Sequence, residues 1–333
     1  MFEKIEQAVN VLQLTRNEIS DEMDISSIEA LIEVFSMIVE HDHEDLNMLD
    51  QEMVTAWENN VNSLSLEKMN VTDRRQILQL VLVGTLMEDQ LQANYQITPD
   101  AIGMWVAYFV DQFNNIENKS NLSILDLGVG SGNLSATIQQ VVENGDQVKI
   151  TGIDNDDTML TLASGMNSIL GYDWNLQLAD AVDFNFTNKF NIVVGDLPVG
   201  MYPKQVEDGY NVKTKQDNDL TYVHHLLIEK ALNTLVPGGT ALLLVPENIL
   251  ETEQGPDLLR LFADDTVLLQ AIIKFPQKLF KQGAVGKELM ILQRRDESHT
   301  QAEPVLLAQI PEIGDSSSNK QFIGDFLDWK TKI

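Results

Sequence analysis

Asp126-Leu127-Gly128-Val129-Gly130-Ser131-Gly132-Asn133 lies directly after an apolar run of strand length and opens a stretch with helical periodicity. Its three glycines let the backbone turn sharply and come close to a bound molecule where any Cβ would clash. The helix start behind them presents unpaired N–H groups, which favour an anionic group. The pattern is not the dinucleotide-binding G-x-G-x-x-G, because the third glycine comes one residue early. The alternative interpretation is a tight strand-to-helix turn without a ligand.

Apolar runs of strand length alternate with helical stretches after this loop. The clearest of these runs, counting the one before the loop, are 124–127, 148–153, 192–194 and 241–245. Such alternation is typical of parallel βαβ units whose strands are buried on both faces. Two further runs, 267–273 and 288–293, are separated by too few residues for a long helix. We therefore expect at least one of them to be antiparallel.

The N-terminal residues follow a different pattern. From Ile25 to Val39 the apolar side chains recur at three- and four-residue steps, and the first proline of the chain is Pro99. This periodicity predicts amphipathic helices. We therefore divide the chain into an acidic α-helical domain, 1–94, and an α/β domain, 95–333. Near the C-terminus, residues 316–318 predict a loop before a short final helix around 322–329.

The composition restricts the possible chemistry. Lys and Arg number 22 against 51 Asp and Glu, a net charge of −29, and there is no cysteine. Thiolate metal sites and cysteine nucleophiles are thereby excluded. The cluster 41–44 (His-Asp-His-Glu) is interpreted as a solvated helix face, so we expect no metal. The longest apolar run, 101–110, is half the ~20 residues that a membrane span needs, and no signal peptide is apparent. We expect a soluble, cytoplasmic protein without a membrane partner.

The negative charge is unevenly distributed. Residues 1–70 hold 16 acidic and 3 basic side chains, whereas residues 271–295 hold six basic side chains and one acidic. An acidic surface repels nucleic acid unless basic residues gather locally. The lysines of the second stretch are therefore candidate nucleic-acid contacts: Lys274, Lys278, Lys281 and Lys287. The alternative is a surface that balances the acidic N-terminal domain.

Three acidic residues follow successive predicted strands. Asp154 comes 22 residues after Gly132, about where an acidic residue accepts hydrogen bonds from ribose hydroxyls. Asp180 follows the candidate strand 176–178 and is placed to accept from an adenine amino group, although a helix N-cap explains it equally well. Asp196 lies at the carboxyl end of the next strand, where open α/β sheets place their chemistry. Asp154 in register with the glycine loop favours a nucleoside ligand, whereas the alternative for the segment that begins at Asp196 is a Pro/Gly loop leaving the sheet.

In order and spacing these motifs resemble class I S-adenosylmethionine (SAM)-dependent methyltransferases. The chain resembles more narrowly the adenine-specific DNA methyltransferases related to the modification subunits of type I restriction systems, because 96–99 matches their Thr-Pro motif and 274–280 the segment before their last strands. The resemblance covers roughly 60–330 and implies a Rossmann-like sheet of seven strands, one of them antiparallel. It also implies SAM as cofactor, held by Thr98, Asp126, Gly128, Gly130, Gly132, Asn133, Asp154, Asp180 and Ala181.

The catalytic loop departs from the family pattern, which reads Asn/Asp-Pro-Pro-aromatic. Here 196–199 reads Asp-Leu-Pro-Val, so Asp196 and Pro198 match, whereas the first proline and the aromatic residue do not. Tyr202 follows three residues later, and we expect it to stack on a flipped-out base instead. The resemblance implies methyl transfer to the exocyclic amino group of adenine in DNA. The missing cysteine excludes methylation of cytosine carbon 5, which needs a thiolate nucleophile.

Two other functions remain open at this level. The departed loop also fits a methyltransferase that acts on RNA, protein or a small molecule. A non-catalytic SAM-binding regulatory protein is the second alternative. A separate target-recognition domain, typically another ~100 residues, is missing after the last predicted strands. For a DNA enzyme we therefore expect minimal recognition, a homodimer or a separate recognition subunit.

Overall fold

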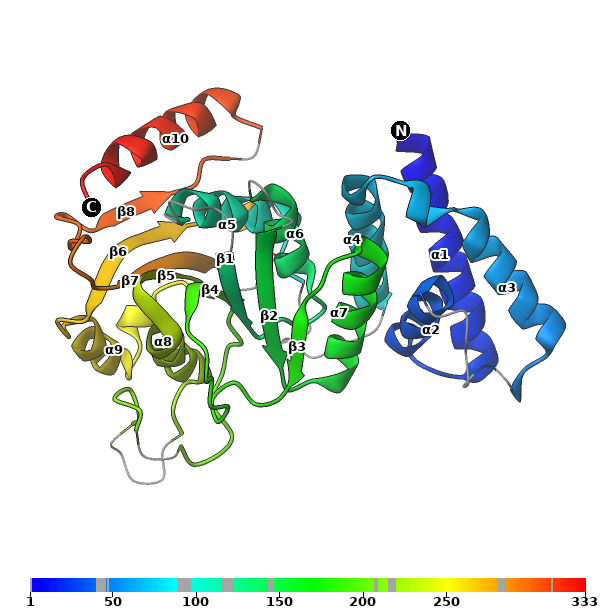
Figure 1. The fold of residues 1–333 in the computed structure, drawn as a ribbon, viewed down its shortest axis with the longest axis horizontal. Coiled ribbons are helices and arrows are strands. Elements are labelled where there is room, and N and C mark those ends of the chain that lie inside the picture. Colours follow the sequence, from blue (N-terminus) through cyan, green and yellow to red (C-terminus); the bar gives the residue numbers. More distant parts are fainter. Residues whose placement is uncertain are drawn as a thin grey trace.

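An eight-stranded sheet forms the centre of the computed structural model (Figure 1). The structure describes residues 2–39, 46, 48–88, 97–114, 122–142, 147–206, 209–214, 220–280, 285–312 and 314–333. Its strands are β1 (Leu122–Leu127), β2 (Val148–Asp154), β3 (Asn175–Leu178), β4 (Phe190–Asp196), β5 (Leu235–Pro246), β6 (Val267–Lys274), β7 (Lys287–Arg294) and β8 (Leu306–Gln309). They lie in the order β3-β2-β1-β4-β5-β7-β6-β8. Within these described strands, only β7 runs antiparallel to its neighbours.

The predicted fold class is confirmed, and one detail is corrected. The antiparallel strand is β7, which lies between β5 and β6. The expected count of seven strands was wrong, because β8 adds an eighth strand parallel to β6 at the sheet edge. This short strand carries no buried apolar run: Leu307 is 74% exposed. A half-exposed edge strand of four residues therefore gives little periodicity to detect.

Helices cover both faces of the sheet (Figure 1). One face packs against α5 (Asp100–Phe113), α6 (Asn133–Val141) and α7 (Asp157–Leu170), and the other packs against α8 (Val223–Thr234) and α9 (Gly255–Phe262). Side chains of a strand point alternately to the two faces. On β1, accordingly, Ile124 joins the core under α5 and α6, and Leu125 joins the core under α8. Because β2, β1 and β4 are parallel neighbours, their carboxyl ends lie side by side at one edge of the sheet.

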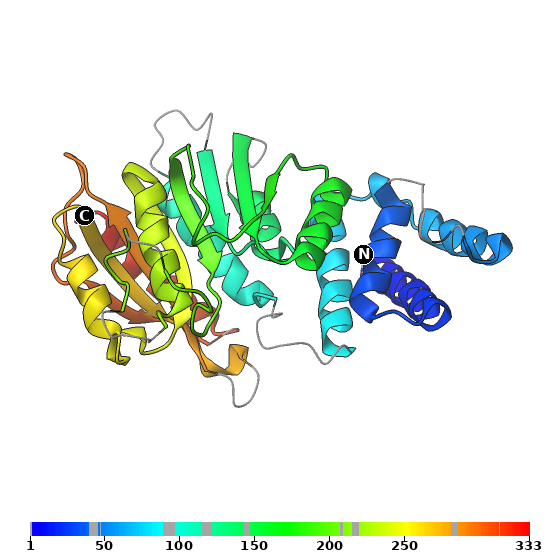
Figure 2. The same cartoon turned by 90° about the horizontal axis from the view of Figure 1, so that it is seen from below.

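The N-terminal region is helical, as predicted. Its helices are α1 (Phe2–Met23), α2 (Ser27–Val39), α3 (Gln51–Ser63) and α4 (Val71–Glu88). They lie beyond the β3 end of the sheet, where α2 and α4 pack against α7 (Figure 2). A Cβ on Gly165 of α7 would lie 2.7 Å from Cδ2 of Phe35, so α2 and α7 are in close contact. The boundary at 94/95 stays a prediction, since residues 89–96 are outside the described part.

The last helix, α10 (Ser316–Lys330), is longer than predicted. Asp315 caps it by accepting a hydrogen bond from the Ser318 N–H at 3.0 Å, so the serines form its first turn and not a loop. Phe326 packs against Phe109 of α5 with ring centroids 4.9 Å apart. None of the helices in the described residues is both long and apolar enough to cross a membrane. Nor do those residues contain a group of three or more potential metal ligands; the 41–44 cluster lies outside them.

Candidate functional site

The glycine loop connects β1 to α6, and its three glycines have a left-handed backbone conformation. Gly128, Gly130 and Gly132 have φ angles of +82°, +51° and +81°, a region that side chains other than glycine rarely adopt. The space around the three residues differs. A Cβ on Gly128 would have no atom within 4 Å, whereas one on Gly132 would lie 2.7 Å from Cζ3 of Trp174. The start of the loop therefore faces open space, and its end packs against protein.

Asp154, at the end of β2, holds this loop in place. Its Oδ2 accepts a hydrogen bond from the Gly130 N–H at 2.7 Å, and its Oδ1 accepts one from the Asp156 N–H at 3.0 Å. Burial raises the pKa of Asp154, and these two hydrogen bonds oppose the rise. The structure thus brings together two motifs that the sequence connected only by spacing.

Two buried oxygen atoms near the loop have no hydrogen-bond partner. Asp126 is 1% exposed; its Oδ2 accepts from the Ser135 hydroxyl at 2.6 Å, and its Oδ1 has no partner. Burial raises the pKa of Asp126 to about 7. The Nδ2 of Asn133 donates to the Thr98 carbonyl at 3.0 Å, and its Oδ1 is also unpartnered. An unsatisfied buried acceptor costs about 1–3 kcal/mol, so the pair is suited to receiving a ligand's N–H donors.

Asp196 lies at the end of β4 and is bonded through both carboxylate oxygens. Oδ2 accepts from the Thr98 hydroxyl at 2.8 Å, and Oδ1 pairs with the ammonium group of Lys287. The first contact joins the Thr-Pro motif to the catalytic loop. The second contact places Lys287, which the sequence predicts as a nucleic-acid contact, in the site. The Lys287 side chain is 19% exposed there.

Tyr202 contacts carboxylates with its hydroxyl group and is 3% exposed. The single proton of the hydroxyl is shared between two acceptors, Oδ2 of Asp180 at 2.8 Å and Oδ2 of Asp183 at 3.1 Å. Burial, followed by the bond to Asp180, raises the pKa of this phenol. The ring therefore has no open face on which a base could stack in this structure, and its expected stacking role finds no geometric support.

Asp180 and Ala181 follow β3 in a turn, and Ala181 is half-buried. Asp180 accepts from the Val182 N–H at 3.1 Å and forms an ion pair with Lys204 at 2.9 Å. Burial alone would raise the pKa of Asp180, but the bonds from Lys204 and Tyr202 bring it below the usual value. The carboxylate is thus ionised and already bonded to three donors, namely the Val182 N–H, Lys204 and Tyr202.

The predicted basic stretch is not one surface. Lys274 is half-buried, Lys287 faces Asp196, and Lys281 lies outside the described residues. Lys278 is 79% exposed and pairs with Glu312 at 3.0 Å. Of the described lysines in the set, Lys278 alone therefore retains the exposure that a nucleic-acid contact needs.

Several residues at this edge carried no signal in the sequence. His224 and His225 lie in the first turn of α8, after Val223, and burial lowers their pKa values to about 4 and about 3, so both rings are neutral. A hydrogen bond with the Pro198 backbone opposes the decrease in the pKa of His224, and this bond places the His224 ring beside the catalytic loop. Lys204 likewise reaches Asp180 from a loop whose sequence predicts only a turn.

Comparisons with known proteins identify the family. Residues 92–324 match the model of the N-6 DNA methylases. A Bacillus subtilis protein of uncharacterised function, YtxK, is 29% identical over 316 residues, which cover 94% of each chain. A candidate class I SAM-dependent methyltransferase from Listeria monocytogenes has a similar crystal structure, with a TM-score of 0.87, 27% identity and 99% of each chain covered.

A more distant structure has the same fold. The methyltransferase subunit of a type I restriction-modification system from Streptococcus thermophilus superposes with a TM-score of 0.64 at 13% identity, over 99% of this chain and 73% of that one. The family match spans the glycine loop, Asp154, Asp180 and Asp196. The chain therefore belongs to the N-6 DNA methylase family of class I SAM-dependent methyltransferases.

Proposed function

We propose that the protein binds SAM and transfers its methyl group to the exocyclic amino group of adenine in DNA. One observation carries the proposal: two hydrogen bonds connect the cofactor motifs to the acceptor carboxylate. Asn133, which follows the glycine loop, donates to the Thr98 carbonyl, and the Thr98 hydroxyl donates to Asp196. A cofactor bound at the glycine loop and Asn133 would therefore face a target amino group bound by Asp196.

The residues present fit SAM. The unpartnered oxygens of Asp126 and Asn133 would accept from its ammonium group, and Asp154 would accept from the ribose hydroxyls. The space in front of Gly128 leaves room for close backbone approach. Asp180 and Ala181 would contact the adenine end. When bound, SAM supplies a methyl group on a sulfonium leaving group that needs no activation.

The chain's own contribution to the reaction is alignment. Asp196 would accept a hydrogen bond from the target amino group and so direct the nitrogen lone pair toward the methyl carbon. Lys287 now holds one oxygen of this carboxylate, and an incoming amino group has to share or replace that contact. Pro198 fixes the backbone of the loop directly after the buried Leu197.

The contacts of Asp196 favour a second candidate function. Both its oxygens are bonded, and Tyr202 offers no stacking face. A SAM-binding protein without methyl transfer, or a methyltransferase for RNA, protein or a small molecule, would not need a base-stacking ring. A methylation assay separates these functions.

Recognition of DNA and location are proposed with the function. Lys278 is the proposed phosphate contact among the described lysines of the basic stretch, because it is exposed and its pairing with Glu312 at the surface is weak. Site specificity would come from a homodimer or a separate recognition subunit. We place the reaction in the cytoplasm, and the division at 94/95 remains part of the proposal.

The experiment has two parts. Isothermal titration with SAM tests the cofactor, and incubation with SAM carrying a labelled methyl group tests the acceptor. Duplex DNA and RNA of matched sequence are then digested to nucleosides and separated. We expect saturable SAM binding and label in N6-methyldeoxyadenosine. Label in an RNA nucleoside only, or SAM binding without label in any nucleoside, would favour the second candidate, and no SAM binding would overturn both.

The affinity for SAM should depend on pH through Asp126. Burial raises the pKa of this carboxyl to about 7, so below pH 7 the folded protein keeps a proton that the unfolded chain releases near pH 4. Stability without ligand should therefore fall as pH rises between these values. The ammonium of SAM favours the ionised carboxylate, so affinity should rise by up to about tenfold per pH unit from 5.5 to 7 and then level off.

Titrations at four pH values from 5.5 to 7.5 measure this slope, and paired buffers of different ionisation enthalpy measure release of about one proton at pH 6. Asp126→Asn should bind more weakly with no slope. Ser135→Ala removes the hydrogen bond that lowers the pKa of Asp126, so the midpoint should move to higher pH. A flat profile in the wild type would exclude Asp126 as the partner of the ammonium group.

A further inference from the structure

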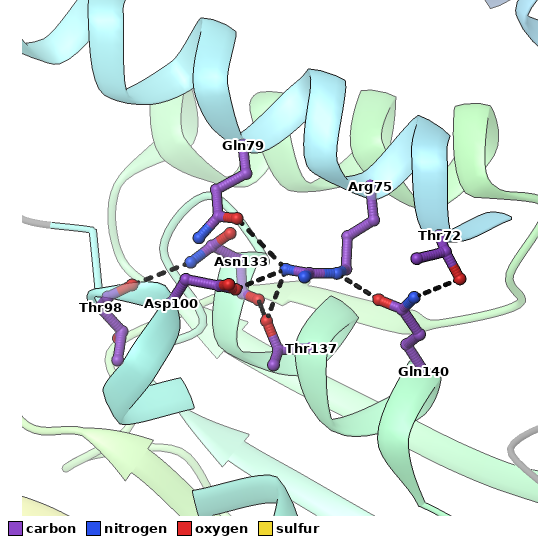
Figure 3. A network of polar contacts seen from close by, with 8 residues as sticks. All are labelled: Thr72, Arg75, Gln79, Thr98, Asp100, Asn133, Thr137 and Gln140. Carbon is purple, nitrogen blue, oxygen red and sulfur yellow. Dashed lines mark hydrogen bonds and ion pairs between the residues drawn. The ribbon is translucent and has the colours of Figure 1, made fainter. Parts of the chain in front are cut away.

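Arg75 is a buried arginine of the N-terminal helical region whose hydrogen bonds reach into the α/β fold (Figure 3). It lies on α4 and is 6% exposed. Its Nη1 donates to Oδ1 of Asp100 at 2.9 Å and to the Thr137 hydroxyl at 3.2 Å, and its Nε donates to Gln140. Asp100 begins α5, and the other two partners lie on α6. A single guanidinium group therefore joins three helices.

The two helices that Arg75 joins begin beside proposed cofactor residues. Asp100 lies two residues after Thr98, and α6 starts at Asn133. The Thr137 hydroxyl donates to the Asn133 carbonyl at 2.9 Å, and Asn133 Nδ2 donates to the Thr98 carbonyl at 3.0 Å. Figure 3 shows these contacts as one continuous network. Arg75 is thus connected to Asn133 by way of Thr137. It also contacts Asp100, which lies two residues after Thr98 in the chain.

The guanidinium group of Arg75 is chemically suited to holding these helices together. A guanidinium group presents several N–H donors in a rigid plane, so it fixes the directions of its partners as well as their charge. Asp100 supplies the opposite charge, and Gln79 of the same helix accepts a further bond at 3.3 Å. A second contact between α4 and α6, from Gln140 Nε2 to the Thr72 hydroxyl at 2.6 Å, also holds these two helices together.

We propose that Arg75 is a positioning residue for the methionine end of SAM, and that α4 is therefore part of the scaffold of the cofactor site. The inference rests on the proposed function for the identity of the cofactor. Arg75 itself does not touch that site; it sets the separation of the α5 and α6 starts, where Thr98 and Asn133 lie. Through α4, the N-terminal helical region thus contributes to cofactor binding.

The adjacent arginine provides a matched control. Arg74 lies on the same helix, and its Nη1 donates to the Ile169 carbonyl at the end of α7, at 2.5 Å. Arg75→Met and Arg74→Met therefore each remove one arginine that joins α4 to the α/β fold. Both should lower the Tm. Arg75→Met alone should raise the Kd for SAM, by at least tenfold, whereas Arg74→Met should leave it within twofold.

The ligand itself gives a readout that a general loss of stability would not. 5′-Methylthioadenosine has the nucleoside end of SAM and lacks its amino and carboxylate groups. Arg75→Met should bind this compound like the wild type, because Asp154 and Asp180 are outside the network. Arg75→Lys keeps the charge without the planar donors and should bind SAM with intermediate affinity.

The outcomes separate this inference from the proposed function. A wild-type protein that does not bind SAM overturns the proposed function. A wild type that binds SAM, with equal losses in Arg75→Met and Arg74→Met or equal losses for SAM and methylthioadenosine, overturns the positioning role. Should Arg75→Met fail to fold, Thr137→Val tests the same connection, since it removes the bonds to both Arg75 and Asn133. Unchanged SAM affinity in that variant would then overturn the role.

Discussion

Gly130→Asp is expected to raise the Kd for SAM at least 100-fold, which corresponds to about 2.7 kcal/mol, while the protein still folds. Aspartate tolerates a positive φ better than most residues, and the nearest atom to a Cβ at this position is Cε of Met159 at 3.7 Å. The protein therefore has room for the side chain. The new carboxylate, however, would enter the cofactor space beside Asp154, which accepts from the Gly130 N–H. Titration calorimetry measures the loss, and thermal unfolding checks the fold.

Gly171→Asp is the control for this substitution. Gly171 ends α7 with φ at +75°, and a Cβ there would have no atom within 4 Å, so the same residue change carries similar backbone strain away from the site. Its SAM affinity should equal that of the wild type. Gly132 is less suitable, because a Cβ there would meet Trp174 and disturb packing. Equal affinities in Gly130→Asp and Gly171→Asp would show that the loop does not bind the cofactor.

The glycine loop and the buried strands could be predicted because both depend on local pattern. A strand, a left-handed glycine turn and a helix start are adjacent in the chain, and buried parallel strands give unbroken apolar runs. The edge strand β8 and the first turn of α10 escaped prediction for the opposite reason. Leu307 is largely exposed, and Ser316–Ser318 become helical through the cap at Asp315 and not through apolar periodicity.

The partners of the site residues could not be predicted, because they come from distant parts of the chain. Lys287 lies in a basic stretch, which favours a surface role, yet the register of β7 against β5 places it next to Pro246, at the carboxyl end of the sheet and beside Asp196. Tyr202 is close to the catalytic loop in sequence, but its hydroxyl group is hydrogen-bonded to Asp180 and Asp183. For Arg75, helical periodicity gives no indication of a buried charge. Such pairings depend on tertiary packing.

Asp196→Ala is expected to reduce kcat for amino methylation by about 10²–10³, a loss typical of removing one group that stabilises the reacting arrangement. Alanine provides no acceptor for the target amino group, and it also removes the hydrogen bond from the Thr98 hydroxyl and the ion pair with Lys287. The Kd for SAM should stay within about twofold, because Asp126, Asn133 and the glycine loop are unchanged. Single-turnover assays with labelled SAM and DNA measure kcat, and calorimetry measures the Kd.

Asp183→Ala is the matched control, because its carboxylate is also bonded at this edge, by Tyr202 at 3.1 Å, but does not contact Asp196 or Thr98 in the described structure. It should retain activity. Asp196→Ala leaves the Lys287 ammonium without its partner, and a loss of activity through local rearrangement has to be separated from a loss of the acceptor. The double variant Asp196→Ala/Lys287→Met removes both charges together and should be as inactive as the single variant. Activity in the double variant within threefold of the wild type would show that Asp196 does not orient the acceptor, and a parallel loss of SAM affinity in the single variant would assign this carboxylate to the cofactor instead.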